Sequence, residues 1–281
     1  MAVITLTTDF GLRDPYVAAM KGVMLSLAPE ARLVDVTHDV ASHDVVGAAL
    51  VLEAAAPFFP PGTVHLAVVD PGVGTARRAL VVATADATFV APDNGLLTPF
   101  FAGGGWRAFE LASSELRLAR VSRTFHGRDV FAPAAAHLAR GVAPERFGPP
   151  VTDPVRVSWP EVRASGTAVA GAVLHVDRFG NLITSIAADA VEGVGARASI
   201  HIAGRRLPLV GTYADLPRGA AGALIGSGNR LEVAVREGSA AAMLKARRGT
   251  PVAVSSTSRT SRKTMKASRT STRGTRTSPR S

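Results

Sequence analysis

Residues Thr63 to Leu80 read TVHLAVVDPGVGTARRAL, a continuous apolar run that leads directly into an acid and a glycine-rich turn. A run without polar alternation is typical of a strand that is covered on both faces of a parallel sheet. The run ends on Asp70, and Arg77 follows seven residues later. This pattern fits either a tight turn with a solvated edge or an active site that pairs a carboxylate with a guanidinium.

Strands and helices alternate on either side of this stretch. β-Branched residues at the start of the chain predict a strand that ends at Asp9, and apolar residues at helical spacing predict a helix within 14–29. The later expected elements are a strand at 32–40, a helix at 44–59, two strands at 79–95 and a helix at 126–141. This order predicts an α/β domain with a mainly parallel sheet over residues 1–150.

The pattern changes after residues 151–160, a proline-rich stretch that we interpret as a linker. Short apolar segments separated by turn residues follow, at 164–186, 198–210, 222–235 and 250–254. Such segments are typical of a small all-β domain, a barrel or a sandwich. We therefore expect a barrel-like C-terminal β domain over residues 161–254.

The net charge of +10 comes mostly from the end of the chain. Residues 255–281 hold eight lysines or arginines and no acid, and the other residues balance to +2. This segment has nothing to bury, so we expect a disordered basic tail. A nucleic-acid-binding role would rest on this tail alone, because the body of the chain shows no matching basic pattern.

The composition also limits the compartment and the chemistry. The chain has no cysteine, which excludes disulfides, thiolate metal sites and cysteine nucleophiles. The N-terminus lacks a signal-peptide pattern, and the longest apolar stretch, Val45–Phe59, is too short to cross a bilayer. We therefore expect a cytoplasmic protein that does not contact membranes.

Polar residues close several of the predicted strands. Asp9 ends the first and Asp70 the third, and Asp93 and Asn94 follow a later one. Open α/β sheets bind ligands at the carboxyl ends of their strands, so these residues predict a site at that edge. Any one of them alone is explained as well by a turn or a helix cap.

Other chemistries have weaker support in the sequence. Gly72 and Gly74 form a lone G-x-G, without the further residues of a dinucleotide or P-loop motif. No histidines have metal-binding spacing, and most fit a core or a surface position. His126 differs, because it lies between an aromatic residue and a glycine where a loop is expected to enter a helix. It is a candidate catalytic residue.

Seven motifs, in order from about residue 3 to residue 254, resemble one enzyme family. They are TLTTDFGLRDPYVAAMKGVM, DVTHDV, FPPGTVHLAVVDPGVGTARRALVV, APDNGLLT, TFHGRDVFAPAAAHLA, HVDRFGNLITSI and GSGNRLEVAVREGSAA. The chain is similar to the S-adenosyl-L-methionine (SAM) hydroxide adenosyltransferases, a group related to SAM-dependent fluorinases and chlorinases. The resemblance implies hydrolysis of SAM to adenosine and L-methionine, with SAM as a substrate and with neither cofactor nor metal.

The resemblance also assigns catalytic roles. It implies that Asp70, Arg77 and His126 bring water to the reacting carbon. The halogenating relatives replace the Asp by Tyr and the other two by small residues, so this chain matches the hydrolytic members. A halogenase of the same fold and a non-catalytic SAM or adenosine sensor stay as alternatives.

Further residues match substrate-binding positions of the family. The resemblance places Asp9 on the ribose hydroxyls and associates Asp177 and Asn181 with the methionine amino group and the adenine. It places Ser227 and Glu232 near the methionine moiety and the adenine edge. The complete set that we expect to bind substrate is Asp9, Asp70, Asn94, Asp177, Asn181, Ser227 and Glu232. The family also implies a homotrimer whose sites lie between the N-terminal domain of one subunit and the β domain of the next.

Overall fold

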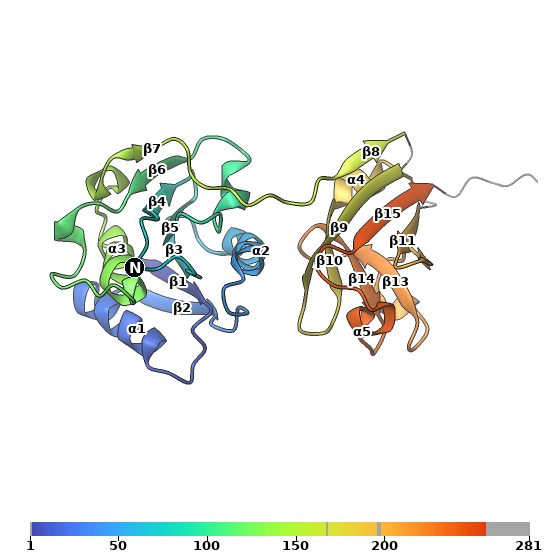
Figure 1. Ribbon diagram of the computed structural model, residues 1–281, viewed down its shortest axis with the longest axis horizontal. Helices are drawn as coiled ribbons and strands as arrows, with labels where there is room; N and C mark the ends of the chain where they lie inside the picture. Colours follow the sequence, from blue (N-terminus) through green and yellow to red (C-terminus); the bar gives the residue numbers. More distant parts are fainter. Residues whose placement is uncertain (1, 167, 196–197, 257–281) are drawn as a thin grey trace, which may run out of the picture.

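The computed structural model describes residues 2–166, 168–195 and 198–256, and in this part of the chain two sheets form two domains (Figure 1). The last strand runs to Ser256, two residues past the expected end of the β domain. The expected basic tail lies outside the described residues from 257 onward. The boundaries at 150, 160 and 254 stay predictions.

The N-terminal domain is built on a sheet with the order β2-β1-β3-β5-β4-β6-β7. Its strands are β1 (Val3–Thr8), β2 (Arg32–Thr37), β3 (Thr63–Val68), β4 (Ala79–Ala83), β5 (Ala87–Pro92), β6 (Arg107–Glu110) and β7 (Pro150–Val151). Its helices are α1 (Tyr16–Leu27), α2 (Val45–Ala55) and α3 (Ala132–Ala139). Its single turns are η1 (Ala56–Phe58), η2 (Thr98–Phe101), η3 (Ser114–Leu116), η4 (Gly127–Phe131) and η5 (Pro144–Phe147).

Strand β3 is buried on both faces, as its uninterrupted apolar sequence predicts. Val64, Leu66 and Val68 pack into a core with α1 and α3, whereas Ala67 belongs to a second core with α2. Side chains alternate between the two faces of a strand, so a strand between two helical layers is mostly apolar, and its buried polar residue His65 pairs with Thr5 at 2.8 Å. The strand therefore lies in the middle of the domain, and its carboxyl end carries Asp70.

The sheet is mixed, and the expectation of a mainly parallel sheet holds for one half of it. The pairs β1–β2, β1–β3 and β3–β5 are parallel, whereas β4–β5, β4–β6 and β6–β7 are antiparallel. Only residues 84–86 separate β4 from β5, and a connection this short can join antiparallel strands but not parallel ones. Because β4 runs back along β5, its first residue lies at the edge where β3 and β5 end.

The C-terminal domain is an antiparallel, barrel-like sheet with the order β12-β11-β15-β9-β10-β14-β13, and β8 pairs with β9. Its strands are β8 (Arg163–Ser165), β9 (Ala168–Val176), β10 (Leu182–Ala187), β11 (Ala198–Ile202), β12 (Arg205–Pro208), β13 (Ala221–Ile225), β14 (Arg230–Val235) and β15 (Pro251–Ser256). Its helices are α4 (Ala188–Glu192), η6 (Tyr213–Asp215) and α5 (Ala240–Leu244). The backbone N–H of Val210 donates to the carbonyl of Ala223 at 2.8 Å, which brings the two ends of the sheet together.

The segment between the domains is fixed to the first sheet. Arg78 donates to Asp93 at 2.8 Å and to Asp153 at 2.8 Å, and the other oxygen of Asp93 accepts from the N–H of Val155 at 2.8 Å. Two residues further on, Val157 donates its N–H to Thr98 at 2.9 Å. These contacts set the direction in which the chain leaves the N-terminal domain.

We expect Asp93→Asn to lower the free energy of unfolding by about 2 kcal/mol, because it removes one charge of a buried pair. The Asp93 side chain is 2% exposed. The control is Asp153→Asn. Asp153 pairs with the same Arg78, but its side chain is 80% exposed, so the free energy of unfolding should change little because water screens such pairs. Urea unfolding curves would measure both, and equal losses in the two variants would contradict the prediction.

Candidate functional site

Asp70 and Arg77 form an ion pair at the carboxyl end of β3. The Nε atom of Arg77 donates to both oxygens of Asp70, at 2.9 and 3.0 Å, and Nη2 also contacts Oδ2. The Arg77 side chain is 11% exposed and the Asp70 side chain is 5% exposed. A bidentate pair of this kind is among the stronger polar contacts in proteins, and here it is largely shielded from water.

The glycine turn between these residues brings the arginine back to the acid. Hydrogen bonds from Val73 N to Asp70 O at 3.2 Å and from Thr75 N to Gly72 O at 3.1 Å close successive turns. Gly74 has a φ of +79°, and a Cβ there would lie 2.6 Å from the carbonyl oxygen of Arg123. The opening stretch therefore forms a tight turn, and this turn builds the ion pair between the carboxylate and the guanidinium.

His126 completes a cluster of three residues. Its Nδ1 atom lies 2.9 Å from Nη2 of Arg77. A guanidinium can only donate, so Nδ1 accepts and a neutral ring carries its proton on Nε2. Burial and the charge of Arg77 hold the pKa of His126 below its ordinary value. The structure thus presents an anion, a cation and a neutral N–H donor in one place.

An unusual helical turn carries His126. The residue precedes η4, a π-helical turn that continues into α3. Pro133 lacks the N–H that would bond to the carbonyl of Asp129 in a regular α-helix, and this carbonyl accepts from Leu118 instead, at 2.9 Å. Phe131 of the same turn lies under the guanidinium of Arg77, 5.2 Å from its ring centre. The turn therefore fixes the arginine from a second side.

Asp9 and Asn94 lie at the same edge of the sheet, since they follow β1 and β5. One oxygen of Asp9 accepts from the backbone N–H of His43 at 2.9 Å. The Asn94 amide donates to the carbonyl of Val69 at 2.8 Å, and its oxygen accepts from Leu96 at 3.2 Å. Asn94 therefore braces the residue next to Asp70.

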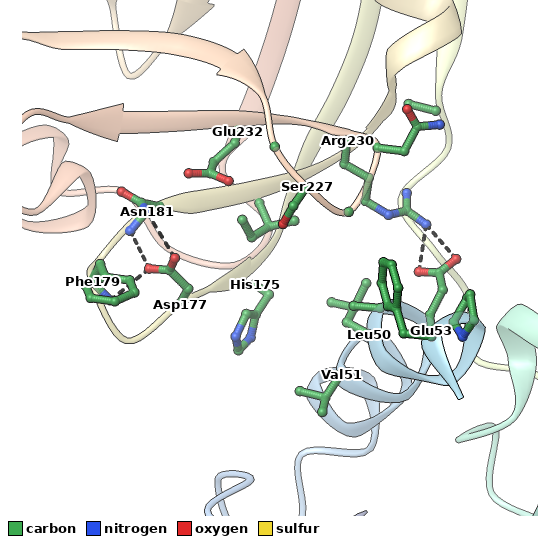
Figure 2. Close-up of a pocket in the computed structure, with 18 of the residues that line it drawn as sticks. Leu50, Val51, Glu53, His175, Asp177, Phe179, Asn181, Ser227, Arg230 and Glu232 are labelled. Carbon is green, nitrogen blue, oxygen red and sulfur yellow. Dashed lines mark hydrogen bonds and ion pairs between the residues drawn. The ribbon is translucent and has the colours of Figure 1, made fainter. Parts of the chain in front are cut away.

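The remaining predicted residues line a cavity of about 740 Å³ between α2 and the β barrel (Figure 2). Asp177, Asn181, Ser227 and Glu232 all line it. The facing wall is the apolar side of α2 with the residues that follow it, namely Leu50, Val51, Ala54, Pro57 and Phe58. A cavity of this size can hold a nucleoside with an amino-acid side arm.

Asp177 organises the barrel side of the cavity. Its Oδ1 atom accepts from the N–H groups of Phe179 and Asn181 at 2.9 and 2.8 Å, and Oδ2 accepts from the Asn181 amide at 3.0 Å. Gly180 allows this turn with a φ of +83°. The turn leaves the Phe179 ring 76% exposed, so an aromatic face is available at the cavity.

Glu232 is paired with Tyr213, a residue that the sequence did not single out. The tyrosine hydroxyl donates to Oε1 of Glu232 at 2.5 Å. Burial raises the pKa of Glu232, and burial together with Glu232 raises the pKa of Tyr213. Both groups line the cavity. Turn η6 positions the tyrosine through a capping box between Thr212 and Asp215, a local pattern that is readable in the sequence.

Two ion pairs hold α2 against the barrel. Arg230 donates to both oxygens of Glu53 at 3.0 Å, as Figure 2 shows. Arg248 donates to Asp44, the N-cap of α2, at 2.7 and 2.6 Å. The pairs lie at opposite ends of the helix, so they fix the wall of the cavity along its length.

The predicted site residues thus form two groups in one chain. Asp9, Asp70, Arg77, Asn94 and His126 belong to the edge of the N-terminal sheet, and none of them lines the cavity. Among the described residues, no group of three or more histidines and acids could hold a metal ion. In the same part of the chain, no helix is long and apolar enough to cross a membrane.

Comparison with known proteins identifies the family. The model of the SAM hydroxide adenosyltransferase N-terminal domain matches residues 4–148, and that of the C-terminal domain matches residues 171–253. The chain belongs to the SAM hydroxide adenosyltransferase family. The resemblance seen in the motifs is confirmed.

Curated relatives in this family carry two kinds of name. An (R)-S-adenosyl-L-methionine hydrolase of Thermus thermophilus is 44% identical, with 90% of this chain and 99% of the relative covered. A second one, from Salinispora tropica, is 43% identical over 86% of this chain and 93% of its own length. A fluorinase of an Actinoplanes species is 31% identical over 76% of this chain and 83% of its own length.

Solved structures share the complete fold. A protein of Thermotoga maritima, described as uncharacterized and conserved, superposes with a TM-score of 0.84 at 34% identity. That match covers 91% of this chain and 100% of the other. The two-domain arrangement is therefore shared by this chain and that protein.

Because Arg77 lowers the pKa of His126 and Asp70 raises it, Arg77→Met should move this pKa upward. NMR titration of the imidazole resonances would measure the shift. His137 gives an internal control, since its pKa is lowered by burial and by Arg140 and should not change. A wild-type His126 that is protonated at neutral pH, or a pKa that Arg77→Met leaves unchanged, would contradict the arrangement.

Proposed function

We propose that this protein hydrolyses SAM to adenosine and L-methionine by attack of water at C5′. The observation that carries the proposal is the Asp70–Arg77–His126 cluster, which combines a shielded carboxylate with two donors. Support also comes from the relatives named as hydrolases, which match nearly the whole chain. The fluorinases match with lower identity.

The chemistry needs little beyond activation of water. Carbon C5′ is already bonded to a sulfonium, so the C5′–S bond breaks with its electron pair passing to sulfur, and methionine leaves as a neutral thioether. The oxygen of water forms the new bond to C5′, and its proton passes to the Asp70 carboxylate and then to solvent. The sulfonium itself activates the leaving group, which is why we propose no cofactor.

Arg77 and His126 have distinct roles in this proposal. The Nε2–H of neutral His126 donates to the water oxygen and holds it in line with the C5′–S bond. Arg77 stabilises the hydroxide character that develops as the proton leaves, and it keeps His126 in the required tautomer. Asp70 contacts the water as an acceptor, which also makes it part of the binding site.

The other predicted residues hold the substrate. We propose that Asp9 accepts from the ribose diol, because a carboxylate presents two acceptors to two hydroxyls. Asn94 keeps the Asp70 end of β3 in place at the same edge. Asp177 and Asn181 bind the methionine amino group and the adenine, and Ser227 and Glu232 complete the cavity. We also retain a cytoplasmic location as a prediction from the sequence.

We propose that a complete site forms only between copies of the chain, in a homotrimer. The reacting cluster does not line the cavity that would hold the rest of the substrate. A neighbouring N-terminal domain could bring its Asp70 edge against the exposed Phe179 side of this cavity. A cyclic trimer would repeat this contact three times.

The first test of the reaction uses SAM in ¹⁸O-water with added chloride, followed by mass spectrometry of the products. We expect adenosine labelled in its 5′-oxygen, together with methionine. Adenosine without label would exclude attack of water at C5′. A halogenated nucleoside would assign the protein to the halogenases, and bound adenosine without any turnover would assign it to a sensor.

A mixing experiment tests the shared site. Asp70→Asn and Asp177→Ala should each reduce turnover by orders of magnitude, since each removes a different half of the site. Co-expressed with separate tags and purified through both tags, the mixed trimers should regain about a third of the wild-type activity, because one of the three interfaces in each mixed trimer joins two intact halves. Mixed oligomers that stay as inactive as the separate variants would show that each chain uses its own two halves.

A further inference from the structure

The loop that carries Asp9 is bound closely to residues 35–43, which include the second of the family motifs, DVTHDV (residues 35–40). We call residues 8–11 the Asp9 loop. The N–H of Gly11 donates to the carbonyl of His38 at 2.9 Å, and that of Val40 donates to the carbonyl of Thr8 at 3.4 Å. With the bond from His43 to the Asp9 carboxylate, the two segments are joined at three points.

The His38 side chain adds a fourth contact from below. It is 4% exposed, and its Nδ1 atom lies 2.8 Å from the hydroxyl of Thr8, which is fully buried. The same hydroxyl accepts from the N–H of Phe10 at 3.3 Å. Thr8 and Phe10 flank Asp9, so the imidazole holds both neighbours of the carboxylate through a single oxygen.

The contact on the other side of the His38 ring indicates which atoms donate in the hydrogen bonds to Thr8 and Phe10. Its Nε2 atom lies 3.0 Å from Oδ1 of Asp35, whose other oxygen accepts from Lys21 at 2.6 Å. Contact with Lys21 and His38 lowers the pKa of Asp35, so it is an anion that favours a proton on Nε2. Nδ1 is then an acceptor, the Thr8 hydroxyl donates to it, and the hydroxyl lone pairs are free for Phe10.

We propose that His38 is a positioning residue that fixes the Asp9 carboxylate for recognition of the ribose diol. The proposal rests on the proposed function, in which Asp9 binds the ribose. His38 is buried beneath the loop, so it acts through Thr8 and Phe10 and does not touch the substrate. The Asp35 carboxylate, 3.0 Å from Nε2, favours the tautomer in which Nδ1 accepts from Thr8.

The test compares SAM with its analogue that lacks the 2′-hydroxyl. The wild type should prefer SAM in kcat/KM by at least about tenfold, because the analogue leaves a carboxylate oxygen unpaired. Asp9→Ala should abolish this preference. We expect His38→Ala to reduce the preference to near that of Asp9→Ala and to raise KM for SAM about tenfold, with a smaller change in kcat.

Two conservative variants separate positioning from bulk stability. His38→Asn keeps an acceptor where Nδ1 stood and should recover part of the preference. His38→Gln places its amide toward Asp35 and away from Thr8, so it should not. The matched control is His65→Asn. His65 is also buried, and it pairs at 2.8 Å with Thr5, which lies in β1 as Thr8 does but does not flank Asp9. It should lower stability and leave the preference unchanged.

The outcomes distinguish this proposal from the proposed reaction. If Asp9→Ala abolishes the preference and a folded His38→Ala keeps the wild-type value, the positioning role is wrong. An equal loss of preference in His65→Asn would also overturn it, since any buried histidine would then serve. If Asp9→Ala keeps the preference, Asp9 does not read the diol and the proposal falls with it, whereas labelled adenosine would still support hydrolysis.

Discussion

The guanidinium of Arg77 is the group on which the cluster of Asp70, Arg77 and His126 depends. It is permanently charged and can only donate, so it balances the shielded Asp70 carboxylate and forces Nδ1 of His126 to accept. Without it, Asp70 would be an unpaired anion at 5% exposure, which costs several kcal/mol. The glycine turn, the π-helical turn and the stacking on Phe131 all serve to hold this one cation. The opening stretch of sequence thus folds back on itself, so that Arg77 lies against Asp70 at the carboxyl end of β3.

Much of the fold follows from local sequence patterns. The apolar run of β3 and the helical spacing in α1 both predict elements that the structure contains. Asp70 and Arg77 are seven residues apart, so their pairing could be anticipated. His126 is 49 residues from Arg77. Only the resemblance to a family connected it to the pair, because no periodicity reports which loop folds over a strand end.

The cavity could not be predicted in this way, because distant residues build it. Arg230 meets Glu53 across 177 positions and Arg248 meets Asp44 across 204. Each of these arginines looks like an ordinary surface residue in the sequence. The antiparallel half of the first sheet has a related cause. The sequence indicates the turn at 84–86, which favours antiparallel strands. The alternation of strands and helices elsewhere favours a parallel sheet, and the two patterns conflict.

The separation of the cluster from the cavity has a chemical consequence. Displacement at a sulfonium carbon needs one ordered water and the exclusion of others, and charged groups act more strongly where bulk water is absent. In a single chain the cluster lies at a sheet edge, and the cavity is closed on one side only by α2. Joining the edge of one copy to the cavity of another would complete the binding surface and enclose the reacting carbon in the same step. Two halves can meet accurately only if each keeps its shape. The ion pairs that hold α2 and the contacts that hold residues 153–157 would both contribute to this rigidity. If the site forms in this way, an isolated chain holds the cluster and the cavity apart, and hydrolysis requires assembly.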